Sequence, residues 1–241
     1  MRLLAALADL VLPALCAGCA APGSLVCTSC AATLAAVPRR ARPEPYPAGL
    51  PPCWTAADYD GPVRELLLAY KERGHRALGP GLGAALARAV AAAVPRGPVT
   101  LVPVPSTAAA VRARGGDHVY RLARAAAGAL RAGGREPQVA RLLVAAGARR
   151  DSAGLDAAQR RDNRAGAFRA RPAVVPDRAL TAHVVLVDDL VTTGATLAEA
   201  ARVLQAVPVG TLSGAVVAAA VRRRSRHGLS LNTTRSVSNW G

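Results

Sequence analysis

The sequence predicts an α/β protein in which a parallel sheet, flanked by helices, follows a small cysteine-rich module. Three observations predict this fold class. Apolar residues make up 51% of the 241 residues and aromatic residues only 3%, so Ala, Val and Leu must build the core. Continuous apolar runs alternate with helical patterns, as they do in βαβ units. Four of the five cysteines fall within residues 16–30.

The N-terminal segment carries one apolar stripe at helical spacing, formed by Leu3, Leu4, Leu7, Leu10 and Val11. We expect a short amphipathic helix that packs on the rest of the chain. The alternative is a targeting segment, but Asp9 would interrupt its apolar core. The sequence has no run of 18 uncharged apolar residues, so we expect no membrane span. This interpretation predicts a cytoplasmic protein.

Two Cys-x-x-Cys pairs follow, formed by Cys16 with Cys19 and by Cys27 with Cys30. Each pair can turn two thiolates toward one ion, and two such turns complete a tetrahedral site that is typical of structural zinc. Gly18 and Gly23 are expected to supply the freedom that the turns need. The alternatives are a redox dithiol or two disulfides, but a redox pair usually opens a helix after a strand.

Residues 38–52 contain six prolines and predict an extended, semi-rigid linker. Cys53 follows it, and we expect this lone thiol to be a small buried hydrophobe without a function. The predicted division of the chain is 1–37 for the N-terminal helix and cysteine module, 38–52 for the linker, 53–221 for the α/β domain and 222–241 for a basic, disordered tail.

Strands and helices alternate through the predicted α/β domain. Pro62 suits a first helical turn and Gly74 a position just past a helix end. The apolar run at 99–104 is typical of a strand that is buried on both faces. By the same criteria we expect helices over 62–74, 80–94, 118–132 and 195–207, and strands over 99–104, 139–144, 183–187 and 211–221.

The most informative segment follows the strand at 183–187. Two carboxylates, Asp188 and Asp189, are followed by a Thr-Thr-Gly loop and a helix. In a parallel sheet the ligand binds outside the carboxyl ends of the strands. Backbone N–H groups, threonine hydroxyls and a helix N-terminus can enclose a phosphate, and two carboxylates can accept hydrogen bonds from sugar hydroxyls or lie near Mg²⁺. The alternative is an ordinary capped turn with solvated acids.

This segment resembles the phosphoribosyl-diphosphate (PRPP) motif of type I phosphoribosyltransferases. The resemblance implies that Asp188 and Asp189 hold the ribose hydroxyls of PRPP. It implies that the loop after them binds the 5-phosphate. The matching positions are Val187, Asp188, Asp189, Thr192, Thr193, Gly194, Ala195 and Thr196.

The chain from about Leu10 to Arg224 is also similar to the ComF family, which is associated with competence for DNA uptake. The match includes the Cys₄ module, Lys71 within 68–74, the Val-Pro-Val-Pro run at 102–105, Arg112, Arg114, Arg160, Asn163, Ala167 and Phe168. Gly116-Asp117-His118 replaces the family's phenylalanine-asparagine-glutamine, and Ser152 replaces a glutamine. The resemblance implies a type I phosphoribosyltransferase-like sheet, in which Lys71, Arg114, Asp188 and Asp189 are candidate catalytic residues.

Two loops are candidates for binding and closure. In type I enzymes the loop after the first strand holds pyrophosphate, and Pro105, Ser106, Thr107 and Arg112 occupy it here. An Arg-rich solvated turn is the alternative. The segment 149–171 contains seven arginines and is longer than most loops, so it is either a lid or a solvated basic loop.

The sequence therefore predicts a protein that binds PRPP with Mg²⁺ and transfers its phosphoribosyl group to an unknown nucleobase-like acceptor. The alternative is a non-catalytic component of DNA uptake that binds a nucleotide, single-stranded DNA or a helicase-like partner. The net charge of +16 suits any polyanion, but the scarcity of aromatic side chains disfavours stacking on single-stranded DNA. The four histidines do not cluster with acids in the sequence, so we expect no histidine-based metal site.

Overall fold

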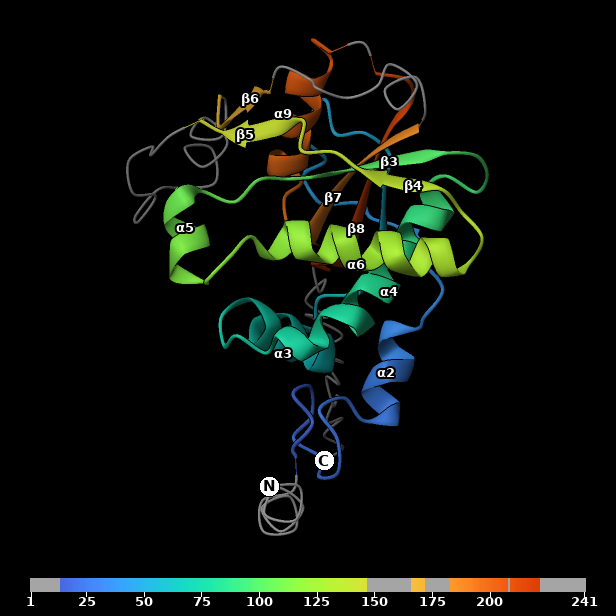
Figure 1. The fold of residues 1–241 in the computed structure, drawn as a ribbon, viewed down its shortest axis with the longest axis vertical. Helices are drawn as coiled ribbons and strands as arrows, with labels where there is room; N and C mark the ends of the chain where they lie inside the picture. The colour runs from blue at the N-terminus through green and yellow to red at the C-terminus, as the bar shows by residue number, and fades with distance from the viewer. Residues whose placement is uncertain (1–13, 147–165, 172–182, 208, 222–241) are drawn as a thin grey trace, which may run out of the picture.

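The computed structural model describes residues 14–146, 166–171, 183–207 and 209–221 (Figure 1). The expected N-terminal helix, most of the expected lid, and the expected basic tail lie outside these residues. So do three positions used in the family resemblance, Ser152, Arg160 and Asn163. Within the described residues, no helix is both long enough and apolar enough to cross a membrane.

A mostly parallel sheet of six strands forms the centre of the molecule and confirms the predicted α/β class. Its strands lie in the order β1-β2-β8-β7-β3-β4, and each neighbouring pair is parallel except β1 with β2. The strands are β1 (Arg39–Arg40), β2 (Cys53–Asp58), β3 (Val99–Pro103), β4 (Pro137–Val139), β7 (His183–Val191) and β8 (Leu212–Ala219).

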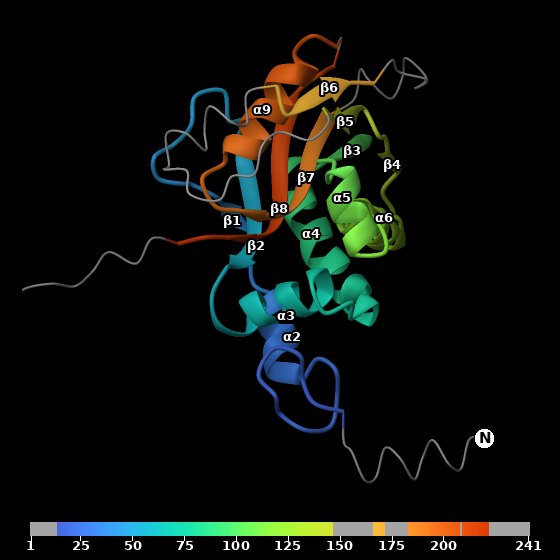
Figure 2. The ribbon, with the colours of Figure 1, turned by 90° about the vertical axis from the view of Figure 1, so that its left-hand side faces the viewer.

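Helices cover both faces of this sheet because its strands are apolar on both sides. Val185 and Val187 of β7 pack in one core with α4 and α6, whereas Val184 and Leu186 pack in a second core with α9 (Figure 2). The helices are α2 (Thr28–Leu34), α3 (Gly61–Lys71), α4 (Gly79–Ala93), α5 (Ala108–Ala113), α6 (His118–Ala132) and α9 (Ala195–Leu204), with a short 3₁₀ helix at Arg76–Leu78.

Most predicted elements are present, and α6 has the predicted bounds. The expected strand over 139–144 is wrong. The chain forms β4 and then β5 (Leu143–Ala145), which pairs antiparallel with β6 (Phe168–Ala170) in a separate ribbon. Arg141 stands between the two strands, and its guanidinium turns toward Asp117 and Tyr120. Arg141 therefore separates the two apolar segments, because its side chain is held by Asp117 and Tyr120.

The proline-rich segment 38–52 packs against the sheet rather than standing apart from it. It contains β1, and Ala41 and Leu50 are buried in the core beneath α9. The N–H of Ala41 also donates to the carbonyl of Cys53, at 2.9 Å. The division of the chain into domains stays a prediction. The described residues of its first two segments pack into the same two hydrophobic cores as the sheet.

Candidate functional site

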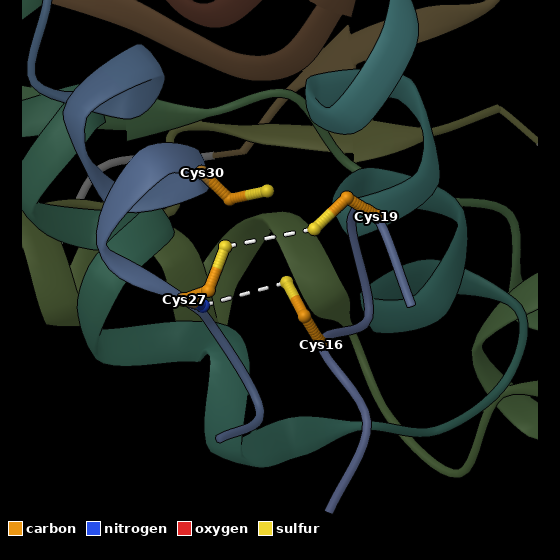
Figure 3. Close-up of side chains that lie close together, drawn as sticks. All are labelled: Cys16, Cys19, Cys27 and Cys30. Atoms are coloured by element: carbon orange, nitrogen blue, oxygen red, sulfur yellow. Dashed lines mark hydrogen bonds between the residues drawn. The ribbon is translucent and has the colours of Figure 1, made fainter. Parts of the chain in front are cut away.

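The four cysteines of the paired motif form one cluster, as the spacing predicts. All four sulfur atoms lie within 4.8 Å of one another (Figure 3). Tetrahedral zinc with Zn–S bonds of about 2.3 Å would place its sulfurs about 3.8 Å apart, so small shifts are enough to bind it. The thiols are free, without a disulfide between them. The cluster of Cys16, Cys19, Cys27 and Cys30 could therefore hold a metal ion such as zinc.

The turn that carries the first two cysteines differs in one detail from the expectation. The left-handed residue is Ala20, at φ 60°, and Gly18 does not adopt positive φ. Gly18 is instead needed for close packing, because a Cβ there would lie 3.0 Å from the sulfur of Cys30 and 3.2 Å from Cγ of Leu66. The cysteine cluster thus packs directly on α3.

Backbone amides favour the thiolate form at one cysteine. Burial raises the pKa of the Cys16 thiol, but N–H groups that include that of Cys27, 3.4 Å from the sulfur, lower it to about 6. Burial raises the pKa of the Cys30 thiol. Metal binding at the cluster would therefore release protons. Cys53 lies outside the cluster in β2, where burial and the charge of Asp188 raise its pKa to about 12.

Asp188 and Asp189 lie inside β7 and not after it, which corrects the predicted end of this strand. Pairing of β7 with β3 ends where Val187 meets Pro103, whereas pairing with β8 continues to Val191. The two acids therefore stand at the level where β3 has already ended. This leaves one side of β7 open beside the loop that follows β3.

Asp189 is the centre of a buried charged cluster. It is 5% exposed, and its Oδ2 atom lies 3.0 Å from Nζ of Lys71 and 3.3 Å from Nε2 of His118. Burial would raise the pKa of Asp189, but the adjacent His118 imidazole and the charge of Lys71 hold it well below its usual range. Asp189 is therefore a carboxylate that pairs with Lys71 and lies in close contact with His118.

His118 was not expected beside an acid, because it is far from both aspartates in the sequence. It is the first residue of α6, and the side chain is 4% exposed. Tyr70 of α3 donates its hydroxyl to the His118 carbonyl at 3.2 Å, so α3 fixes both His118 and Lys71. Within the part of the chain that the structure describes, neither ring nitrogen of His118 forms a hydrogen bond, so the 3.3 Å between its Nε2 atom and Asp189 is a close polar contact.

Asp188 has a different environment from its neighbour. It is half-buried and accepts a hydrogen bond from the backbone N–H of Asp189, at 2.8 Å. Burial and the adjacent Asp189 carboxylate raise the pKa of Asp188 well above its usual range. The two acids thus favour opposite protonation states, as coupled carboxylates do.

The Thr-Thr-Gly loop leads from β7 into α9 as the sequence predicts. Thr192 and Thr193 are exposed, and Gly194 is the left-handed cap of α9 at φ 74°. No side chain caps this helix, and only a long hydrogen bond of 3.5 Å joins the Ala195 N–H to the Thr193 hydroxyl. The first N–H groups of α9 are therefore available to an anion. Thr196 is half-buried in the first turn.

Gly194 also brings the proline-rich segment close to this loop. A Cβ at Gly194 would lie 3.0 Å from Leu50 and 3.1 Å from both Pro43 and Pro47. Glycine is thus required by the backbone conformation and by the packing. Residues 43–50 therefore pack against this loop at Gly194.

The expected pyrophosphate loop lies in part on a cavity of about 370 Å³. Pro105, Ser106 and Arg112 line this cavity, whereas the Thr107 hydroxyl accepts from the Ala110 N–H and caps α5. Arg114 does not line the cavity. Its guanidinium binds both carboxylate oxygens of Glu72, at 3.0 and 3.4 Å.

Neither a protein-family model nor a curated protein matches this chain. What the chain does must therefore be argued from its own geometry. Of the predicted site residues, Lys71, Asp188, Asp189 and the loop at 192–196 lie near the end of β7, and His118 lies there as well. Arg114 was also predicted for the site, but its side chain pairs with Glu72.

Proposed function

We propose that this chain has a type I phosphoribosyltransferase-like fold, binds PRPP with Mg²⁺ and transfers the phosphoribosyl group to a nucleobase-like acceptor. One observation carries the proposal. An acid pair within β7 is followed, after the end of the strand, by a Thr-Thr-Gly loop whose left-handed glycine stands at the N-terminus of α9. This arrangement offers acceptors for sugar hydroxyls and donors for a phosphate only a few residues apart.

The 5-phosphate of PRPP would bind at the start of α9. The N–H groups of the first helical turn point toward the loop, and the positive end of the helix dipole favours an anion there. The exposed hydroxyls of Thr192 and Thr193 add two donors. Gly194 keeps the loop tight, because its left-handed backbone and its packing on residues 43–50 both disfavour a side chain.

The ribose would bind at Asp188, the more accessible of the two acids. Asp189 is already bound to Lys71 and His118, so its part is to keep a negative charge behind the sugar. As a carboxylate, Asp188 would hold Mg²⁺, whose positive charge would offset the repulsion from Asp189 that raises the pKa of Asp188 and would neutralise charge on the diphosphate. The sequence resemblance implies that Asp189 binds the ribose directly. In this proposal Asp189 instead stabilises the site through its charge.

In the proposed transfer the bond from C1 of the ribose to a diphosphate oxygen breaks, and that oxygen keeps the electron pair. A nitrogen of the acceptor donates its electron pair to C1 and loses a proton. The carboxylates near the ribose stabilise the positive charge that develops on the sugar, and basic side chains stabilise the leaving diphosphate. Arg112 and Ser106, which line the cavity beside β3, would supply the second contribution.

For the cysteine cluster we propose a structural zinc ion. Four thiolates fill a tetrahedral coordination sphere and leave no open position for a substrate. The cluster also packs on α3, which carries Lys71. Zinc would therefore act on the PRPP site only through the position of this helix.

A single-stranded DNA site is less well supported. Among the described residues, the ring of Trp54 lies under Arg40, at 4.4 Å, and that of Tyr120 lies under Arg141, at 4.2 Å. Tyr46 is the aromatic residue that stands out as exposed there, at 53%. Single-stranded binders normally offer several free aromatic faces for stacking.

Calorimetric titration of Mg²⁺-PRPP tests the proposal. Wild type should bind, and Asp188→Asn should bind about tenfold or more weakly, because a neutral amide accepts hydrogen bonds from hydroxyls less strongly. Asp58→Asn is a matched control, since Asp58 ends β2, pairs with Arg39 and lies away from β7. A nucleobase screen for pyrophosphate release then tests turnover. Equal affinity of Asp188→Asn and wild type would contradict the proposed pocket.

A further inference from the structure

An apolar cavity of about 290 Å³ lies among α2, α3 and α4, on the side of the molecule that carries the cysteine module (Figure 1). Of its lining residues, Leu34, Leu66 and Leu82 are buried, whereas Ala31 and Gly81 are exposed. The cavity is therefore an open groove with an apolar interior. We call it the α2–α4 groove.

The α2–α4 groove has room for another apolar element. A Cβ at Gly81 would meet no neighbouring side chain and no other element within 4 Å. Arg88 is the charged residue of the lining, and its guanidinium already donates to the Leu34 carbonyl at the end of α2. Apolar surface that gathers in this way usually marks a contact with a further apolar element.

The sequence before residue 14 supplies a matching apolar surface. On a helix, one face would carry the stripe of Leu3, Leu4, Leu7, Leu10 and Val11. This stripe would be about 12 Å long, at 1.5 Å per residue. Pro13 disfavours helical backbone at the residue before it, so a helix here would end by Leu12.

The described chain begins close to the α2–α4 groove. The N–H of Ala17 donates to the Leu25 carbonyl at 2.9 Å, and Leu25 precedes Val26, which lines the groove. The Ala14 carbonyl accepts the Gly23 N–H, at 2.8 Å, on the same module. Residues 12 and 13 span at most about 7 Å when extended, so the stripe stays within reach of the groove.

We propose that residues 3–11 form a helix whose leucine stripe docks in the α2–α4 groove of the same chain. The short connection keeps the segment at a high effective concentration beside its own groove, which favours this site over the groove of a second copy. The opposite face carries Arg2 and Asp9, and not the cluster of basic residues that is typical of helices on anionic membranes. The docked helix would contact α2 and, at Leu66, α3, so it would stabilise the cysteine module independently of the proposed function.

Hydrogen exchange measured by mass spectrometry on the full chain tests the docking. In wild type the amides of residues 3–11 should exchange about tenfold or more slowly than in an unstructured peptide, because docking protects the hydrogen bonds of the helix. Leu7→Glu places a charge at the centre of the stripe and should remove this protection. Ala5→Glu is the matched control, since Ala5 lies on the opposite face, and it should exchange like wild type.

A second pair of variants tests the groove itself. Ala31 and Ala32 are neighbouring exposed residues of α2, and Ala31 lines the groove whereas Ala32 does not. Ala31→Glu should speed the exchange of residues 3–11 about tenfold, because the carboxylate would face the apolar stripe, and Ala32→Glu should leave it unchanged. A thermal melt followed by circular dichroism checks that both variants keep the fold. Loss of protection in Ala31→Glu alone assigns the segment to the groove.

Three outcomes would overturn docking within one chain. The first is rapid exchange of residues 3–11 in wild type, or protection that survives in Ala31→Glu. The second is protection that disappears on dilution together with a dimer in analytical ultracentrifugation, which would assign the groove to the segment of a second copy. The third is protection that develops only with vesicles of phosphatidylglycerol, which would assign the stripe to an anionic membrane surface.

Discussion

The cysteine cluster and the acid pair are built in opposite ways. The four cysteines come from one stretch of fifteen residues, 16–30, and the turns between them bring the sulfurs together. Asp189 is in β7, and its partners come from α3 and α6, so the three elements that form this cluster are far apart in the chain. A metal site of the first kind can be inferred from spacing, whereas a charged cluster of the second kind exists only in the folded protein.

Helix α3 joins the two regions. Leu66, near its middle, packs where Gly18 and Cys30 approach the helix, and Lys71, at its end, reaches Asp189. Tyr70 also fixes the start of α6 through the His118 carbonyl. A loss of order in the cysteine cluster should therefore reach the acid pair, whereas a change at the acid pair should leave the cysteine cluster unaltered.

The largest expected effect is loss of the metal. Cys16→Ala should abolish zinc binding, and the cysteine module should unfold, because structural zinc contributes about 10–16 kcal/mol of folding free energy in small zinc domains. Cys53→Ala is the control and should keep one zinc per chain, since Cys53 lies outside the cluster. Metal analysis with a thermal melt measures both. Zinc retained in Cys16→Ala, or lost in Cys53→Ala, would exclude the assignment.

The second largest effect is a difference in stability between the asparagine variants of the two acids. Asp189→Asn removes a buried partner of Lys71 and His118 and should lower the free energy of unfolding by about 1–3 kcal/mol, a moderate loss because Lys71 can turn toward solvent. Asp188→Asn should not destabilise the protein, since it removes a charge that burial and Asp189 disfavour. Urea unfolding measures both variants. Equal stability losses would show that the difference between their environments has no energetic consequence.

The contributions of Asp188 and Asp189 to the unfolding free energy should change in opposite directions with pH. The pKa of Asp189 is depressed in the folded protein, so its stabilising contribution is present above about pH 4 and is lost as the pH falls further. The pKa of Asp188 is raised, so its contribution declines as the pH rises from about 4 toward neutrality. Unfolding free energies of wild type and both asparagine variants between pH 3 and 7 measure this. A profile for Asp189→Asn parallel to that of wild type would contradict the first sign.

The sequence predicts the features that depend on neighbouring residues. The cysteine spacing, the bounds of α6 and the loop before α9 follow from local patterns and are confirmed by the structure. The length of β7 does not, because aspartates are unfavourable inside strands. They are tolerated here since β3 has ended beside them and Lys71 neutralises Asp189.

One departure from the family pattern is explained only by the fold. Gly116 has φ 139°, which a larger residue would adopt with strain. Asp117 caps α6 and binds Arg141, and His118 binds Asp189. These contacts join the acid pair to Arg141 across the start of α6. Sequence order alone does not reveal them, because each partner lies in a different element.

Substitution at His118 should have a smaller effect than loss of Asp189. His118→Ala removes the imidazole 3.3 Å from Asp189 but leaves Lys71, so we expect Mg²⁺-PRPP affinity to fall about three- to tenfold. His118→Gln keeps an N–H donor of similar reach and should restore most of the affinity. Calorimetry compares the three proteins. If His118→Gln binds PRPP as weakly as His118→Ala, the His118 side chain acts through packing and not as a hydrogen-bond donor.

The smallest expected effect is at Thr193. Its hydroxyl is exposed and has only a long contact of 3.5 Å with the Ala195 N–H, so Thr193→Val should leave the unfolding free energy almost unchanged. The 5-phosphate would lose one of several donors, while the N–H groups of α9 are kept. We therefore expect Mg²⁺-PRPP affinity to fall only about three- to tenfold, with pyrophosphate affinity unchanged. Calorimetry with both ligands measures this, and an equal loss for pyrophosphate would place the two anions in the same site and contradict the separation of the loop from the cavity that Ser106 and Arg112 line.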